Sequence, residues 1–218
     1  MDQDTITAIA TAPGRGGVGI VRLSGRKALD IGQTLTRCQL QKRHAHYCSF
    51  YQSDDSVLDT GIGLYFPGPG SFTGEDVFEI QAHGGPVILD LIVRETCRLG
   101  ARQARPGAFS ERAYLNVKID LTQAEASADL INCTTEQAAL NASRSWRGEF
   151  SEKIQQLVQL VTEIRVYTEA AIDLPEEEID FIQDSNIKER LHGIIQHFNA
   201  GTSEARQGSR VQEGMKLV

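Results

Sequence analysis

The chain has 218 residues, 40% of them hydrophobic and 23% charged, and its formal net charge at pH 7 is −7. Its length is enough for one large domain or two modest ones, and its composition is ordinary for a soluble globular protein. The acidic balance excludes a surface that holds nucleic acid by bulk electrostatics, although a local basic patch stays open. No run comes near the roughly 18 apolar residues of a membrane span.

The first residues and the cysteines indicate the compartment. The start, "MDQDTITAIATA", carries acidic residues and no basic segment, so it is not a secretion signal. The cysteines lie far apart, with no C-x-x-C pair and no histidine at ligand spacing, which argues against structural zinc. We therefore expect a cytoplasmic protein with reduced or buried thiols, no membrane contact and no metal-binding residues. The four cysteines are Cys38, Cys48, Cys97 and Cys133.

The first 118 residues combine short β-like runs with helical stretches. Glycines and prolines separate the runs, and the stretch from 86 to 100 opens with Pro86 and closes with Gly100, as helices often do. Strands mixed with helices, without strict alternation, predict an α+β domain over residues 1–118. The predicted strands are 5–11, 18–25, 61–68 and 76–84, and the predicted helices are 26–36 and 86–100.

After residue 118 the apolar spacing becomes helical. Residues 121–146 are rich in alanine and leucine, and two later segments, Ile154 to Ile164 and Ile187 to Phe198, repeat apolar residues at i, i+3, i+4 and i+7. These segments predict three long helices. We interpret the acidic stretch 173–180 between them as a solvated turn, with an ion site as the alternative.

The last residues predict a strand that stops as soon as it starts. A polar stretch, 205–214, is followed by "MKLV", which has the apolar character of a buried strand. Such a strand has no partner in this part of the sequence. We therefore expect the chain to be the front part of a longer protein.

The glycine-rich stretch "PGRGGVGIVRLSG" (13–25) raises the possibility of a cofactor loop. Gly14, Gly16 and Gly19 fit the G-x-G-x-x-G pattern of dinucleotide-binding proteins. In that motif the third glycine opens a helix, whereas Gly19 is followed by β-branched residues that predict a strand. No G-x-x-x-x-G-K-[ST] P-loop occurs either. We interpret the glycines as a β–β connection that needs positive φ or close backbone approach.

Charged residues in three stretches are candidates for a site, and each has a plainer alternative. Arg22 interrupts an apolar strand, so it either forms a structural ion pair or directs its guanidinium at a carboxylate or polar heterocycle. Glu79 and His83 lie on the strand 76–84, where they either line a site or face solvent. The third stretch, 104–126, places basic residues near the predicted domain boundary, with surface charge as the alternative. These basic residues are Arg105, Arg112 and Lys118.

Four motifs occur in a fixed order: "PGRGGVGIVRLSG", "GPGSFTGEDVFEIQAHGG", "ARPGAFSERAYLNVKIDLTQAEA" and "EAAIDLPEEEIDF". Together they closely resemble the MnmE (TrmE) family of tRNA-modification GTPases, and the resemblance covers essentially the whole chain. It implies that residues 1–118 form an α+β domain similar to the tetrahydrofolate-binding domain of aminomethyltransferases. Residues 119–212 would form the first part of a helical domain. Residues 213–218 would begin the first strand of a GTP-binding domain inserted into the helical one.

The resemblance also implies a role in tRNA modification. Members of the family work with an FAD-dependent partner, MnmG, to place a 5-carboxymethylaminomethyl group on wobble uridine-34 of certain tRNAs. Their N-terminal domain is expected to form a homodimer and to bind 5-formyl- or 5,10-methylene-tetrahydrofolate. The family motifs assign folate contacts to Arg22, Glu79 and Lys118, and they assign no catalytic role to any residue of this chain.

Several parts of the family pattern are missing from these residues. There is no P-loop, no switch segment and no C-terminal cysteine motif. GTP, Mg²⁺ and K⁺ are therefore expected only in the full-length parent protein, which would be the GTP hydrolase. Half of the helical domain should be missing too, so we expect its helices to expose apolar stripes.

Two other interpretations stay open. A freestanding folate-dependent aminomethyl or formyl transferase would share the domain and the site, but it would turn over without partner proteins. A non-catalytic dimerisation scaffold would share the fold and bind no folate.

Overall fold

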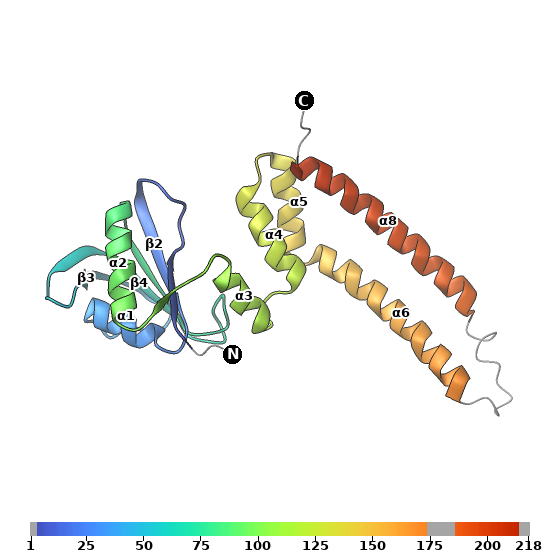
Figure 1. The fold of residues 1–218 in the computed structure, drawn as a ribbon, viewed down its shortest axis with the longest axis horizontal. Coiled ribbons are helices and arrows are strands. Elements are labelled where there is room, and N and C mark those ends of the chain that lie inside the picture. The colour runs from blue at the N-terminus through green and yellow to red at the C-terminus, as the bar shows by residue number, and fades with distance from the viewer. Residues whose placement is uncertain (1–3, 174–185, 214–218) are drawn as a thin grey trace. The chain divides into compact units, whose positions relative to one another are not determined.

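The computed structural model describes residues 4–173 and 186–213, which divide into two units, Met1–Ile119 and Asp120–Val218 (Figure 1). The first unit combines a sheet with helices, and the described part of the second is helical. This arrangement confirms the predicted α+β fold followed by a helical domain.

The sheet of the first unit has six strands in the order β3-β4-β5-β2-β1-β6. β1 and β6 pair in parallel, and every other neighbouring pair is antiparallel. The order places β2 and β5 side by side in the middle of the sheet. The strands are β1 (Ile6–Ile9), β2 (Gly16–Ser24), β3 (Ala45–Tyr51), β4 (Val57–Phe66), β5 (Val77–Gly84) and β6 (Arg102–Gln103).

Helices α1 (Ala28–Thr36) and α2 (Pro86–Arg98) pack on one face of this sheet. Because side chains alternate along a strand, β2 and β5 each direct every second residue toward these helices. The core between them contains Val21, Leu23, Phe78, Ile80 and Ile92, all of them buried. A third helix, α3 (Ala108–Leu115), follows β6.

The four predicted strands and both predicted helices of this unit are present, with ends shifted by a few residues. Strands β3 and β6 and helix α3 were not predicted. The glycine-rich stretch contains no helix, since Gly16 and Gly19 lie in β2. Gly14 has a φ of 141°, and a Cβ on Gly19 would lie 2.5 Å from Leu89 Cδ1. Both expected uses of glycine, positive φ and close approach, therefore occur in this connection.

The second unit begins with a correction to the predicted long helix over 121–146. The structure divides that range into α4 (Leu121–Asn132) and α5 (Glu136–Trp146). The Asp120 side chain caps α4 by accepting a hydrogen bond from the Gln123 N–H, and Thr135 caps α5 in the same way at Ala138. The second cap starts a new helix, so the alanine-rich range cannot continue as one.

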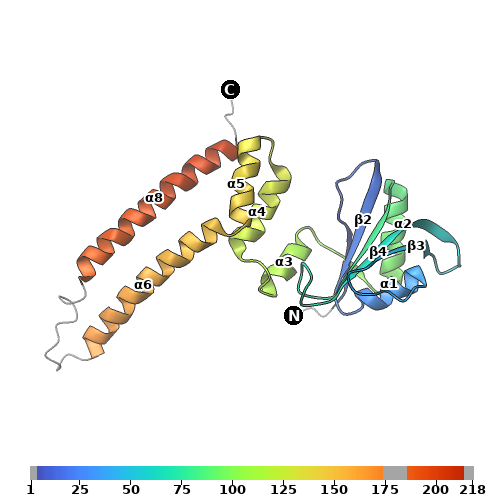
Figure 2. The ribbon, with the colours of Figure 1, turned by 180° about the vertical axis from the view of Figure 1, so that it is seen from behind.

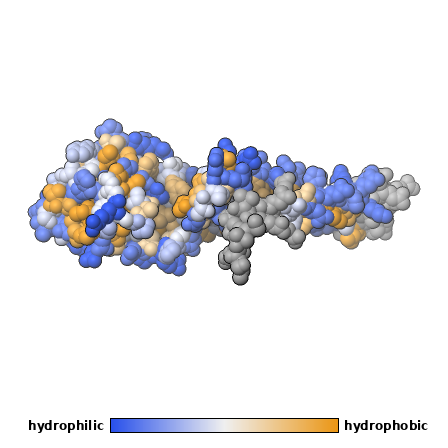
Figure 3. All heavy atoms as spheres, turned by 90° about the horizontal axis from the view of Figure 1, so that it is seen from above, coloured by the Kyte–Doolittle hydropathy of each residue, from blue (hydrophilic) through white to orange (hydrophobic). Residues whose placement is uncertain are grey.

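Two longer helices follow, α6 (Glu149–Asp173) and α8 (Ile187–Glu213), and they lie side by side in Figures 1 and 2. Many of their apolar side chains are exposed: Val158 is 59% exposed and Phe198 61%. Apolar side chains also reach the surface in Figure 3. The predicted acidic turn at 173–180 lies almost wholly outside the described residues, as does the predicted strand "MKLV". In the described ranges, no helix is both long enough and apolar enough to cross a membrane.

Candidate functional site

The two central strands of the sheet bring Arg22 and Glu79 together. They are register partners across β2 and β5, and Arg22 Nε donates a hydrogen bond to Glu79 Oε1 over 2.8 Å. Their sequence neighbours Val21 and Phe78 face the core, so by alternation both charged side chains lie on the opposite face. They are largely but not completely covered, with 29% and 14% of the side chains exposed. The ion pair that the sequence allowed for Arg22 is therefore present.

Two aromatic rings lie beside this ion pair. The guanidinium carbon of Arg22 is 5.6 Å from the ring centre of Phe72 and 5.9 Å from that of Phe109. Both distances are within the range of cation–π attraction. Phe72 belongs to the segment 67–76 that joins β4 to β5, and Phe109 belongs to the first turn of α3. Two flat, apolar rings from different parts of the unit thus lie close to the guanidinium of this pair.

Hydrogen bonds from polar side chains hold segment 67–76 in place. The Ser24 hydroxyl, at the end of β2, lies 2.7 Å from the Thr73 hydroxyl and donates a hydrogen bond to Glu75 Oε2. Ser24 and Thr73 are both fully buried. On the side of α3, the Asn116 amide donates to the Thr73 carbonyl. A buried polar group normally needs such partners, so these bonds fix the position of the segment.

Lys118 lies against the same segment but does not touch the ion pair. Its ammonium donates a hydrogen bond to the Pro69 carbonyl over 2.9 Å. Val117, with a φ of 56°, turns the chain at the end of α3, and the Lys118 N–H then bonds to the Ala113 carbonyl. Lys118 is exposed. Within the described ranges it forms no ion pair, so a ligand with a negative charge would meet an uncompensated cation.

The other charged candidates have structural partners. His83 Nδ1 lies 2.8 Å from Asp59 Oδ1, and the His83 N–H donates to Asp59 Oδ2. Burial favours a higher pKa for Asp59, but the hydrogen bonds from His83 and Thr60 outweigh it and lower the pKa. Arg105 lies 3.6 Å from Glu111 at the surface.

The sequence did not single out Phe72 and Phe109, whose rings lie near the ion pair, or Glu75, which accepts a hydrogen bond from Ser24. Phe72, Glu75 and Phe109 lie in a segment without regular structure or in the first turn of a short helix. No periodic pattern assigns a direction to side chains in such places. The one available signal was their position within the motifs that also contain Glu79 and Lys118.

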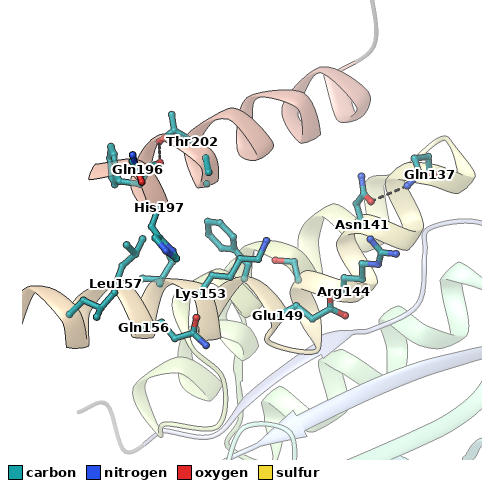
Figure 4. Close-up of a pocket in the computed structure, with 17 residues that line it drawn as sticks. Gln137, Asn141, Arg144, Glu149, Lys153, Gln156, Leu157, Gln196, His197 and Thr202 are labelled. Carbon is teal, nitrogen blue, oxygen red and sulfur yellow. Dashed lines mark hydrogen bonds between the residues drawn. The ribbon is translucent and has the colours of Figure 1, made fainter. Parts of the chain in front are cut away.

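The helical unit holds a separate groove with a volume of about 1160 Å³. It is formed by α5, α6 and α8, and Figure 4 shows His197 pointing from α8 toward Leu157 of α6. Its walls mix apolar side chains such as Phe150 and Ile154 with polar ones such as Lys153. The groove contains none of the residues to which the resemblance assigns folate.

Comparison with known proteins agrees with the two units. Residues 5–118 match the family described as "GTP-binding protein TrmE N-terminus", and residues 121–216 match the "MnmE helical domain". Together the two matches cover almost the whole chain.

Three curated relatives share the same name. The chain is 55% identical over 215 residues to the tRNA modification GTPase MnmE of Marinobacter nauticus, covering 99% of this chain and 47% of the relative. It is 56% identical over 217 residues to the protein of that name from a Marinomonas species, covering 100% of this chain and 47% of the relative. For Photobacterium profundum the identity is 55% over 216 residues, covering 99% and 48%. The chain thus spans about half the length of these relatives.

Proposed function

The chain belongs to the MnmE (TrmE) family of tRNA-modification GTPases, and on that premise we propose that its α+β unit binds a one-carbon tetrahydrofolate. The observation that carries the proposal is the Arg22–Glu79 pair on the face of the sheet opposite α1 and α2, with the rings of Phe72 and Phe109 close to Arg22. A reduced pterin contains a flat pyrimidine ring with adjacent N–H donors along one edge. A carboxylate can accept two such hydrogen bonds, and aromatic rings suit the flat faces.

Glu79 remains able to accept hydrogen bonds from a ligand. An ionised carboxylate has about four lone-pair positions, and Arg22 uses one of them on Oε1. Arg22 in turn is held in place by Glu79 and by the neighbouring rings. We therefore assign Glu79 to the pterin edge and Arg22 to the orientation of Glu79.

Lys118 suits the other end of the folate. Because Glu79 already balances the charge of Arg22, the exposed ammonium of Lys118 is the better partner for the carboxylates of the glutamate tail. The Lys118→Ala substitution should weaken binding of 5-formyltetrahydrofolate triglutamate about tenfold. Binding of 5-formyltetrahydropteroate, which lacks the glutamates, should change little. Equal losses for the two compounds would show that Lys118 does not meet the tail.

The α+β unit is also the proposed site of homodimerisation. One face of its sheet lies away from α1 and α2, and on it Tyr47 is 81% exposed while Ile20 and Ile62 are half-buried. Apolar side chains on a sheet face favour burial against a second surface. Sedimentation equilibrium should give twice the 24.0 kDa mass of one chain. A Tyr47→Glu variant should shift the mass toward that of the monomer.

The wider role follows from membership of the family. We propose that the parent protein hydrolyses GTP with Mg²⁺ and K⁺ and supports 5-carboxymethylaminomethyl modification of wobble uridine-34 in tRNA with the flavin enzyme MnmG, in the cytoplasm. Residues 1–118 would supply folate binding and dimerisation, and residues 119–212 would supply the first part of the helical domain. Residues 213–218 would start the GTP-binding domain. Turnover by this chain without MnmG would instead indicate a freestanding transferase.

A further inference from the structure

Arg112 connects three separate parts of the α+β unit, and one of them is the segment that contains Phe72 of the proposed folate site. Its Nη1 donates hydrogen bonds to the Asp4 carbonyl, the Ser24 carbonyl and Glu75 Oε2 over 2.9, 3.2 and 2.9 Å. Its Nη2 donates to the Asp4 carboxylate. The side chain is only 12% exposed. One guanidinium thus joins the chain before β1, the end of β2 and the segment before β5 to helix α3.

Glu75 carries the effect of Arg112 into segment 67–76. The same oxygen, Oε2, accepts hydrogen bonds from Arg112 and from the Ser24 hydroxyl. Ser24 also bonds to the Thr73 hydroxyl, which is fully buried. Phe72, whose ring lies beside Arg22, is the residue next to Thr73. The hydrogen bonds that start at Arg112 therefore reach Thr73, the residue next to Phe72.

Helix α3 contains both Arg112 and Phe109, the second aromatic residue near Arg22. Phe109 precedes Arg112 by three residues, one turn earlier on α3. Its ring lies beside the Arg22 guanidinium. Because Arg112 lies on α3 and bonds to Glu75, it links the helix that contains Phe109 to the segment that contains Phe72.

We propose that Arg112 is a positioning residue of the folate site, which holds Phe72 and Phe109 beside the Arg22–Glu79 pair. The inference rests on the proposed folate-binding function. Arg112 itself is directed at Asp4, Ser24 and Glu75, so it acts on the ligand through these neighbours. A lysine keeps the charge, but its ammonium has three N–H donors on one atom and cannot reproduce the four hydrogen bonds that the Nη1 and Nη2 atoms of Arg112 make.

Two variants and a matched control test the proposal. Arg112→Lys keeps the charge, and Arg112→Ala removes the side chain. Arg102→Lys is the control, because Arg102 pairs with the same Asp4 carboxylate over 2.6 Å but, among the described residues, forms no hydrogen bond to segment 67–76 or to Ser24. Titration with 5-formyltetrahydrofolate measures the site. Hydrogen exchange of residues 67–76 without ligand measures the position of the segment independently.

Chemical rescue adds a readout that a general loss of stability does not produce. A cavity of about 150 Å³, lined by Arg112, Glu75 and Asn116, lies next to the guanidinium. In Arg112→Ala, free guanidinium ion can enter the vacated position and restore the charged hydrogen bonds. Urea at the same concentration has a similar shape without the charge, so it serves as the control.

We expect Arg112→Lys to weaken folate binding about tenfold or more and to speed exchange of residues 67–76, while Arg102→Lys changes neither. Guanidinium, but not urea, should recover much of the affinity of Arg112→Ala. Unchanged exchange in 67–76, unchanged affinity, or equal effects of the Arg102 and Arg112 variants would overturn the positioning role. Absence of binding by the unaltered chain would overturn the proposed function, and this inference with it.

Discussion

Arg22 Nε and Glu79 Oε1 lie 2.8 Å apart across the two central strands of the sheet, and the ring centres of Phe72 and Phe109 lie 5.6 and 5.9 Å from the Arg22 guanidinium carbon. Opposite charges in the middle of a sheet, under partial cover, form a preorganised polar site rather than a solvated surface pair. Glu79 keeps free lone pairs after it accepts the bond from Arg22. A flat ligand can therefore bond to Glu79 without displacing its partner.

Gly19 and Gly17 should respond very differently to alanine. A Cβ on Gly19 would lie 2.5 Å from Leu89 Cδ1 and 3.0 Å from Gly84 Cα, both in the packed interior. We expect Gly19→Ala to lower the free energy of unfolding by about 1–3 kcal/mol. A Cβ on Gly17 meets nothing within 4 Å, so Gly17→Ala should change it by less than about 0.5 kcal/mol. Urea unfolding followed by circular dichroism measures both, and equal effects would contradict the packing argument.

Val117 holds a backbone conformation that a β-branched residue rarely adopts. Its φ is 56°, and its side chain is 90% exposed, so packing does not compensate for the strain. Val117→Gly should therefore raise the free energy of unfolding by about 0.5–1 kcal/mol. Gly107→Ala is the converse change, because Gly107 has a φ of 77° and open space around it. This substitution should lower the free energy of unfolding by about 1 kcal/mol. A thermal melt in which Val117→Gly is less stable than the unaltered chain would refute this account.

The Asp59–His83 contact should make the stability of the α+β unit sensitive to acid. Burial opposes ionisation, but the hydrogen bonds from His83 and Thr60 hold the pKa of Asp59 below 3.8. A lowered pKa gives stability that is fully present above the ordinary value and is lost as the pH falls through the lowered one. At pH 7, Asp59→Asn should lower the free energy of unfolding by about 1–3 kcal/mol.

The pH dependence of this stability difference tests whether ionisation of Asp59 causes it. As the pH falls below the lowered pKa of Asp59, the difference between Asp59→Asn and the unaltered chain should shrink toward zero, because both side chains are then neutral. Asp90→Asn is a control that changes an exposed i,i+4 pair with Arg94, and it should alter stability by less than about 0.5 kcal/mol. A constant difference from pH 7 to pH 2 would mean that ionisation of Asp59 does not contribute.

The helical unit should exchange its amide hydrogens faster than the sheet. In α6, Val158 and Val161 are 59% and 53% exposed, whereas Ile164 is 8% exposed, and in α8 Phe198 is 61% exposed. Helices with little buried apolar surface open at a low free energy. We expect low protection over 121–213 and high protection in β2 and β5. Uniform protection across both units in a monomer would contradict the expectation.

The sequence could predict the elements whose patterns repeat. Alternation around Val21 and Leu23 predicted β2, and Pro86 at the start of an apolar run predicted α2. Strand β3 escaped prediction because it lies at the edge of the sheet, where Tyr47 is largely exposed and the alternation is weak. The break between α4 and α5 depends on one cap at Thr135, a signal that a run rich in alanine conceals.

The charged residues of the candidate site could be selected from the sequence, but the aromatic residues near them could not. Arg22 stood out because it interrupts an apolar strand, and Glu79 because it matches a family motif. Their direct contact depends on strand register, which only the folded chain defines. Phe72 and Arg112 act through positions set by tertiary contacts with residues far away in the sequence. No local pattern carries that information.

Titration calorimetry with 5-formyltetrahydrofolate tests the central claim most directly, with the unaltered chain compared with Arg22→Ala and Glu79→Ala. The account predicts binding by the unaltered chain and a loss of at least tenfold in each variant, with circular dichroism showing that both variants remain folded. No binding by a well-folded dimer, or undiminished binding by both variants, would contradict the assignment of the folate site to Arg22 and Glu79.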